Sequence, residues 1–195
     1  RARQQGFDTD RILYHGTTRN LLSLDPLEGQ SGRRGVFLTT NPDSAASYGA
    51  KSEADDEFQV LYPVIAKTDK PIVIDAQGES WQDIRGRATV RTTPTENQPA
   101  ELMSLEELMS AFYPTAESMP SMFSTDQILR AITDARKGGV LDIDSVIFKN
   151  VVDNGPIMPR KFDPEKGRSS FDDEAFNRRQ QPADVVVVLE PQNVR

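Results

Sequence analysis

The chain of 195 residues has a length within the usual range for one domain with a sizeable core. Hydrophobic residues make up 36% and charged residues 27%, and no apolar run approaches the roughly 20 residues of a membrane helix, so we expect neither a disordered tail nor a membrane partner. The sequence has no Cys and a single His, which excludes disulfides, thiolate chemistry and multi-histidine metal sites, while its net charge of −7 disfavours nonspecific binding to phosphate backbones.

The organisation of the sequence indicates one domain. No internal repeat or low-complexity linker divides it, so we expect a single domain over residues 1–195. The first residues have no apolar core of the kind that a signal peptide carries. Because the chain begins with Arg rather than Met, we expect a domain excised from a larger protein.

The first half of the chain alternates short apolar stretches with turn residues, a pattern that predicts strands. The strands are expected at residues 12–14, 36–38, 61–66 and 72–74. After the second strand come Asn41 and Pro42, an N-cap and a proline at the first helical position, which predict a short helix. Ala45 and Tyr48 are three residues apart and therefore share one face of that helix.

The middle of the chain has the signals of helices. Ser104 and Glu107 form a capping box in front of apolar residues at the helical period. A second helix is predicted to begin at Ser124 or Thr125 and to end at Gly138-Gly139. Late strands are expected at residues 146–148 and 185–189, and polar surface loops at residues 87–99 and 153–183. The chain is therefore predicted to be α+β, with strands at both ends and helices between them.

Three segments contain residues suited to ligand chemistry, and each also has a purely structural interpretation. His15 is followed by Gly16, which lets a ligand approach the backbone, although a lone His at a strand end is more often structural. Phe37 lies on a strand and Tyr48 on the helix after it, where core aromatics are common. Asp184 precedes four valines that indicate a strand buried on both faces, and such an acid is most often a solvated charge.

Together, and in this order, the three segments resemble the ADP-ribosyltransferase superfamily of the diphtheria-toxin and poly-ADP-ribose-polymerase type. Its pattern is a His-Gly on the first core strand, a Tyr on the helix after a Gly-x-aromatic strand, and an acid before a late strand. The similarity is closer to ADP-ribosyltransferase domains in polyvalent proteins of phages and mobile elements, and it extends from about Gly6 to Val194. The blocks that support it are GFDTDRILYHGTT, GVFLTTNPDSAASYG, YPVIAKTDKPIVIDAQGESW, STDQILRAITDARKGG, SVIFKNVVDNG and ADVVVVLEPQNVR.

The resemblance implies a split core of two packed, mainly antiparallel sheets, with a helical segment in the middle of the chain. It also implies an NAD pocket. His15 would hydrogen-bond the ribose next to nicotinamide, and the backbone of Gly16, with Thr17 beside it, would hold the carboxamide. Tyr48 would stack on the nicotinamide ring, and Phe37 would close the other side, where relatives often carry a Tyr.

Two positions depart from the family pattern. Ala45 stands where many relatives use a Ser to bind the carboxamide, a loss of about 0.5–1.5 kcal/mol of binding. Asp184 stands where relatives commonly carry a Glu, and it is shorter by one bond of about 1.5 Å. As the catalytic carboxylate it would stabilise positive charge on the ribose and orient or deprotonate the acceptor. Glu190 is a poorer candidate because it lies at the far end of the strand.

The implied reaction is transfer of ADP-ribose from NAD to a macromolecular acceptor with release of nicotinamide, with NAD hydrolysis as a side activity and no metal. The acidic balance of the chain favours a protein acceptor over a nucleic acid. The resemblance places such a toxin-like effector in the cytoplasm of a bacterial host, delivered by a phage or mobile element. Two alternatives stay open: a catalytically silent NAD-binding or interaction module, and a structural domain of a phage protein.

Overall fold

The structure is a computed structural model that describes residues 1–18, 21, 24, 35–49, 60–94, 100–112, 120–156, 158–165 and 167–195. Its main strands are β1 (Leu13–Thr17), β2 (Val36–Thr39), β3 (Val60–Val64), β4 (Pro71–Asp75), β6 (Thr89–Arg91), β7 (Leu102–Ser104), β9 (Ser145–Val151) and β12 (Ala183–Val188). The remaining strands are β5 (Ile84–Arg85), β8 (Met122–Phe123), β10 (Arg160–Asp163) and β11 (Arg168–Phe171). The helices are α1 (Pro42–Gly49), α2 (Leu105–Phe112), α3 (Thr125–Lys137) and α4 (Asp173–Arg179), with 3₁₀ turns η1 (Arg3–Gln5) and η2 (Pro191–Asn193).

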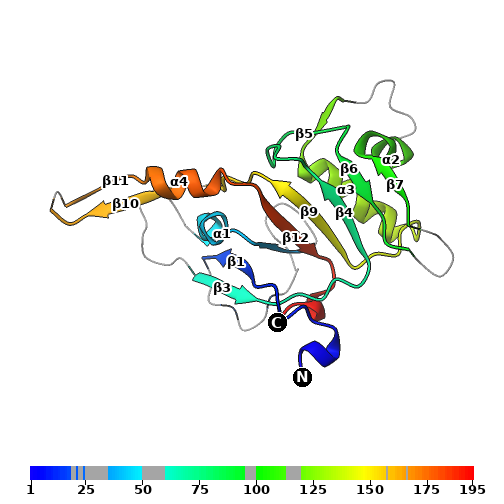
Figure 1. Cartoon of the computed structure of the whole chain (residues 1–195), viewed down its shortest axis with the longest axis horizontal. Coiled ribbons are helices and arrows are strands. Elements are labelled where there is room, and N and C mark those ends of the chain that lie inside the picture. The colour runs from blue at the N-terminus through cyan, green and yellow to red at the C-terminus, as the bar shows by residue number, and fades with distance from the viewer. Residues whose placement is uncertain are drawn as a thin grey trace.

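The main strands form one eight-stranded sheet in the order β3-β1-β2-β12-β9-β4-β6-β7, and β5 with β8 and β10 with β11 form two small sheets (Figure 1). The pair of β4 and β9 is parallel, whereas the other neighbours are antiparallel. A parallel pair needs a crossover across a face of the sheet, and the segment between β4 and β9 supplies it with α2 and α3. The predicted α+β class, with mainly antiparallel sheets and helices in the middle of the chain, is confirmed.

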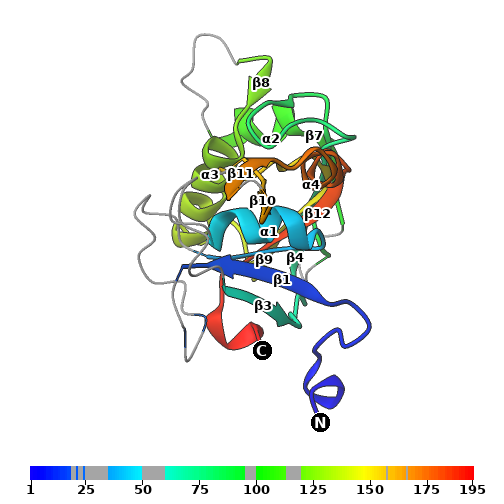
Figure 2. The same ribbon diagram turned by 90° about the vertical axis from the view of Figure 1, so that its left-hand side faces the viewer.

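Strand β12 separates two hydrophobic cores. Val185 and Val187 belong to the larger core, which packs under α2 and α3, and Val186 and Val188 belong to the smaller one. All four are buried, as the run of valines predicted. Helix α1 lies over β1 and β3 instead, away from α2 and α3 (Figures 1 and 2).

The predicted helix starts are confirmed by their hydrogen bonds. The Asn41 side chain accepts from the backbone N–H groups of Asp43 and Ser44, at 3.0 and 3.2 Å. At α2 the Ser104 hydroxyl accepts from the Glu107 N–H at 3.2 Å, and the Glu107 carboxylate accepts from the Ser104 N–H at 2.7 Å. Helix α3 begins after Ser124 with a second capping box. None of the helices within the described ranges is long and apolar enough to cross a membrane.

The predicted surface loop at 153–183 is wrong, because this segment contains a hairpin and a helix. Strands β10 and β11 pair residue for residue, and the hairpin extends away from the body of the protein (Figure 1). Helix α4 follows, with Asp172 as N-cap accepting from the Ala175 N–H at 3.0 Å. Both faces of an exposed hairpin contact solvent, so its sequence need not alternate apolar and polar residues, and the strands were not predicted. The loop predicted at 87–99 likewise contains β6, and its residues 95–99 lie outside the described part of the chain.

We expect Ser124→Ala to lower the free energy of unfolding by about 1 kcal/mol, because the hydroxyl accepts from the Gln127 N–H at the start of α3. Denaturant titration followed by circular dichroism measures the change. Ser110→Ala, at an exposed position inside α2, is the matched control and should change the free energy of unfolding by less than about 0.5 kcal/mol. Equal losses in the two variants would contradict the capping role.

Candidate functional site

The candidate site begins where β1 and β2 part. The two strands pair at Tyr14 and Thr39, and a regular ladder would continue two residues further to a pair of Gly16 with Phe37. At that point the carbonyl of Phe37 lies 2.9 Å from Nδ1 of His15. A carbonyl only accepts hydrogen bonds, so Nδ1 must carry a proton, and a neutral ring then offers Nε2 as an acceptor. The His15 ring is therefore held in one tautomer, with its second nitrogen suited to a hydroxyl donor such as that of a ribose.

Gly16 is required by helix packing. A Cβ atom built at this position would lie 1.6 Å from the carbonyl oxygen of Ala45 in α1, which no side chain can tolerate. The backbone of α1 therefore rests directly on the backbone of β1, as Figure 2 shows for the two elements. Thr17 ends β1 beside the last turn of the same helix, where a Cβ at Gly49 would lie 3.0 Å from the Thr17 carbonyl oxygen. Tyr48 belongs to α1, the helix that this close packing fixes against β1.

Tyr48 presents an aromatic ring that is 42% exposed, and its hydroxyl is anchored on a buried carboxylate. The phenol oxygen lies 3.0 and 3.1 Å from the two carboxylate oxygens of Asp153, which is only 6% exposed. Burial raises the pKa of Asp153, while hydrogen bonds from the Gly155 N–H and the Tyr48 hydroxyl and the charge of Arg179 act in the opposite direction. The sequence analysis did not identify Asp153, because residues 153–183 have no periodic pattern that places them against α1.

Phe37 has a different environment from Tyr48. Its side chain is partly buried against the larger core, and its ring makes an edge contact with Trp81 at 6.3 Å between centroids. Trp81 in turn packs edge-on against Phe148 at 5.3 Å. Phe37 therefore belongs to the border of the core, and the more exposed of the two predicted rings is that of Tyr48.

The carboxylate of Asp184 is held by two groups. One oxygen lies 2.6 Å from a guanidinium nitrogen of Arg11, and the other accepts from the backbone N–H of Asn150 at 3.2 Å. Asn150 has a φ of 52° and lies where the register of β9 against β12 shifts. The side chains of Arg11 and Asp184 are 31% and 26% exposed, so the carboxylate is reachable but its charge is compensated.

His15 and Asp184 lie on β1 and β12, two strands that are separated by β2. Side chains alternate between the two faces of a strand, so Asp184 lies on the same face as Val186, and His15 on the same face as Leu13. Val186 and Leu13 both belong to the smaller core. The alternation therefore places His15 and Asp184 on one face of the sheet, two strands apart, and Gly16, on which α1 packs, on the other face. Arg11 was not predicted as a site residue, because its partner Asp184 is 173 positions away in the chain.

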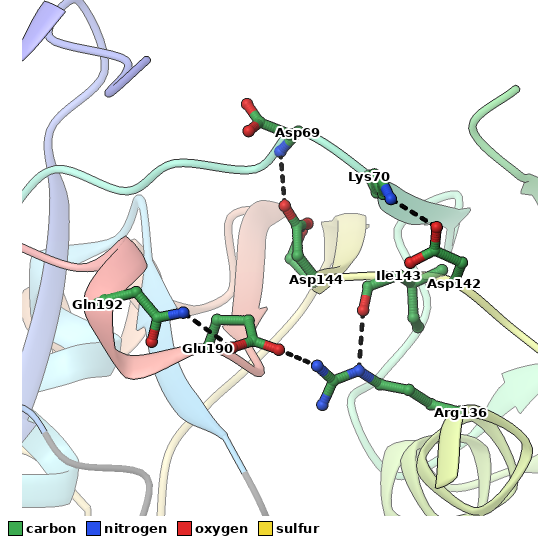
Figure 3. Close-up of polar contacts among 9 residues, drawn as sticks. Asp69, Lys70, Arg136, Asp142, Ile143, Asp144, Glu190 and Gln192 are labelled. Atoms are coloured by element: carbon green, nitrogen blue, oxygen red, sulfur yellow. Dashed lines mark hydrogen bonds and ion pairs between the residues drawn. The ribbon is translucent and has the colours of Figure 1, made fainter. Parts of the chain in front are cut away.

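Glu190, the alternative acid, lies in a different region. A surface depression of about 560 Å³ separates the end of α3 from the turn between β3 and β4, and Glu190 lines it together with Lys70 and Arg136. Glu190 forms an ion pair with Arg136, and Lys70 forms one with Asp142 (Figure 3). Glu190 follows Asp184 by six positions and lies beyond Val188, the last residue of β12, so the two acids are at opposite ends of this strand. Glu190 therefore does not belong to the site around His15.

Comparison of the chain with protein-family models, with curated proteins and with solved structures finds no match. Within the described ranges, no three acidic or histidine side chains come together as ligands for a metal ion. The resemblance to ADP-ribosyltransferases therefore depends on the sequence motifs alone.

We expect Gly16→Ala to lower the free energy of unfolding by at least about 2 kcal/mol, because the new methyl group would overlap the Ala45 carbonyl and push α1 off β1. Thermal and denaturant unfolding measure the loss. Gly138→Ala is the control, since Gly138 has a φ of −74° and its added Cβ would lie 3.5 Å from the nearest atom. A Gly16→Ala protein as stable as the Gly138→Ala protein would show that α1 does not rest on β1 in this way.

Proposed function

We propose that this chain binds NAD and transfers ADP-ribose to a macromolecular acceptor, releasing nicotinamide. The observation that carries the proposal is the arrangement around the end of β1. His15 is fixed in one tautomer by the Phe37 carbonyl, and α1, which carries the exposed ring of Tyr48, packs on Gly16 of the same strand. Asp184, the second residue of β12, lies on the face of the sheet that His15 shares, and α1 packs on the Gly16 side of β1. A hydroxyl acceptor, a flat aromatic surface and a carboxylate are the groups that a nicotinamide riboside requires.

The binding half of the proposal uses His15 and Tyr48. Nε2 of His15 would accept a hydrogen bond from a ribose hydroxyl, because Nδ1 is committed to the carbonyl of Phe37. Tyr48 would stack its exposed ring on the nicotinamide, a contact that aromatic faces favour. Both residues are held before a ligand arrives, which reduces the entropy lost on binding.

The chemical half uses Asp184. When the bond between ribose and nicotinamide breaks, its electron pair leaves with the nicotinamide, which becomes neutral, and positive charge develops on the ribose. A fixed carboxylate stabilises that charge. The acceptor then donates an electron pair to the ribose carbon and gives its proton to a base, and with water as the acceptor the products are ADP-ribose and nicotinamide. Asp184 has the charge for the first role and is accessible enough to meet the sugar.

One observation favours a second candidate, a catalytically silent NAD-binding module. The guanidinium of Arg11 lies 2.6 Å from the Asp184 carboxylate and compensates the charge that the reaction needs. An enzyme would have to move Arg11 aside or share the carboxylate between Arg11 and the sugar, whereas a binding module requires no change. Nicotinamide release separates the two candidates.

We expect His15→Ala to raise the Kd for NAD about threefold to tenfold, since it removes one hydrogen bond to the ribose. Tyr48→Ala should weaken binding more than Tyr48→Phe, because stacking contributes more than the hydroxyl. Isothermal titration calorimetry of each variant gives the Kd. Val140→Ala, at a surface position that is 66% exposed beyond the end of α3, should bind as the parent does. If the parent itself gives no binding heat and no thermal stabilisation with NAD, the proposed function is wrong.

We expect Asp184→Asn to reduce nicotinamide release at least about a hundredfold while changing the Kd for NAD by less than about threefold, because the carboxylate acts on charge that appears in the transition state. Chromatographic detection of nicotinamide measures turnover. Glu190→Gln is the matched control and should keep the parental rate, since Glu190 is paired with Arg136 in a separate region. Loss of turnover in Glu190→Gln with parental turnover in Asp184→Asn would assign the acid to the wrong end of β12.

The same assay decides the second candidate. A parent that binds NAD and releases no nicotinamide is the silent module. Asp184→Glu then becomes informative, because the longer side chain reaches about 1.5 Å further from the strand. Activity gained by Asp184→Glu would show that the length of one side chain separates a binding module from an enzyme.

A further inference from the structure

Asp153 is a buried acid for which the proposed reaction has no use. It lies just after β9, is 6% exposed and belongs to neither strand nor helix. A carboxylate loses much of its hydration at such a depth, which is costly unless specific partners compensate for it. Its position therefore calls for an explanation in terms of those partners.

The partners come from α1 and from the backbone next to Asp153. The hydroxyl of Tyr48 lies within hydrogen-bonding distance of both carboxylate oxygens, at 3.0 and 3.1 Å, and the Gly155 N–H donates to one of them at 3.0 Å. The charged group that faces the carboxylate is Arg179 of α4, itself only 6% exposed. Arg179 is in turn influenced by Asp43 and Asp172, so Asp153 is one of several acids around this buried cation.

The backbone around Asp153 is wedged between α1 and α4, two helices that lie side by side in Figure 1. The Ser44 hydroxyl donates to the Asp153 carbonyl at 2.6 Å, and a Cβ at Gly155 would lie 1.6 Å from the Ser47 hydroxyl oxygen. On the other side, Arg179 donates to the Asn154 carbonyl at 3.3 Å. These contacts hold the main chain without using the Asp153 carboxylate, so the carboxylate is available for Tyr48.

We propose that Asp153 is a positioning residue for Tyr48, whose carboxylate anchors the phenol so that the exposed ring has one orientation before a ligand stacks on it. This inference rests on the proposed function, because it names the ring that would receive nicotinamide. A tyrosine side chain that is fixed at its hydroxyl loses its rotational freedom in advance, and the ligand does not have to order it. An ionised carboxylate offers two acceptor oxygens to the phenol, whereas a protonated one loses acceptor capacity and gains a donor.

The affinity for NAD and the stability of the fold should change in opposite directions as the pH falls. Burial raises the pKa of Asp153 above the ordinary value of 3.8. As the pH falls through the raised pKa, Asp153 takes up a proton, the anchor weakens and NAD binding should become weaker. The stability of the fold changes in the opposite direction. A protonated Asp153 no longer bears the cost of a buried charge, so its contribution to the stability of the fold increases until the pH reaches the value of the unfolded chain.

The test is a double-mutant cycle with Tyr48→Phe and Asp153→Asn, with NAD as the probe in calorimetric titrations at several pH values. Each single variant should raise the Kd about threefold to tenfold at neutral pH, and the double variant should be no weaker than the weaker of the two, because both remove the same contact. The affinity of Asp153→Asn should not change through the window in which that of the parent falls. Asp134→Asn, an exposed acid on α3, is the matched control and should keep the parental affinity and pH dependence.

Unfolding measurements on the same variants without NAD distinguish positioning from a purely structural role. The difference in stability between the parent and Asp153→Asn should shift in favour of the parent as the pH falls, while its NAD affinity falls. If Asp153→Asn binds NAD as tightly as the parent at every pH, or if the effects of the two substitutions simply add, the inference is overturned and the proposed function stands. If the parent binds no NAD, the proposed function fails and the assignment of Tyr48 as the stacking ring fails with it.

Discussion

The burial of β12 on both faces is the constraint on which the rest of the structure depends. Val185 and Val187 contribute to the core under α2 and α3, and Val186 and Val188 to the core that includes β1 and β3. The strand is paired with β2 on one side and β9 on the other, so neither core can form without it. Burial of each valine side chain stabilises the fold by a few kcal/mol, and the four together hold β12 in place. The backbone of Asp184 belongs to this strand and is therefore held in place with it.

Two carboxylates near the candidate site have opposite environments. Asp184 is partly exposed and neutralised by Arg11, whereas Asp153 is buried and held by neutral donors with a cation beyond them. Environments that differ in this way separate the tasks that two acids can perform. A solvent-accessible carboxylate can meet a sugar, while a buried one is limited to orienting its neighbours. The two acids lie on different elements, Asp184 within β12 and Asp153 just after β9, and the two proposed roles follow this difference in exposure.

Helix α1 packs between β1 and the segment that contains Asp153. Its close approach to β1 at Gly16 fixes the height of Tyr48 above the sheet, and its contacts with residues 153–155 fix the ring from the other side. The same helix meets α4 through the ion pair of Asp43 with Arg178 at 2.7 Å. In the chain, α4 lies between the projecting hairpin and β12, the strand that contains Asp184.

The α+β class, the caps of three helices and the doubly buried valine strand could be predicted from the sequence alone. Capping and burial on both faces are local signals, and the side chains that produce them lie within a few residues of one another, as Asn41 does with Ser44. The motifs around His15, Tyr48 and Asp184 were also visible, although their chemical roles remain predictions. Three contacts could not be predicted without the folded structure: the packing of α1 on Gly16, the ion pair of Arg11 with Asp184 and the hydrogen bond of Tyr48 to Asp153. The contacts behind these three findings join residues 29, 173 and 105 positions apart, and no local pattern encodes which distant side chain fills a given space.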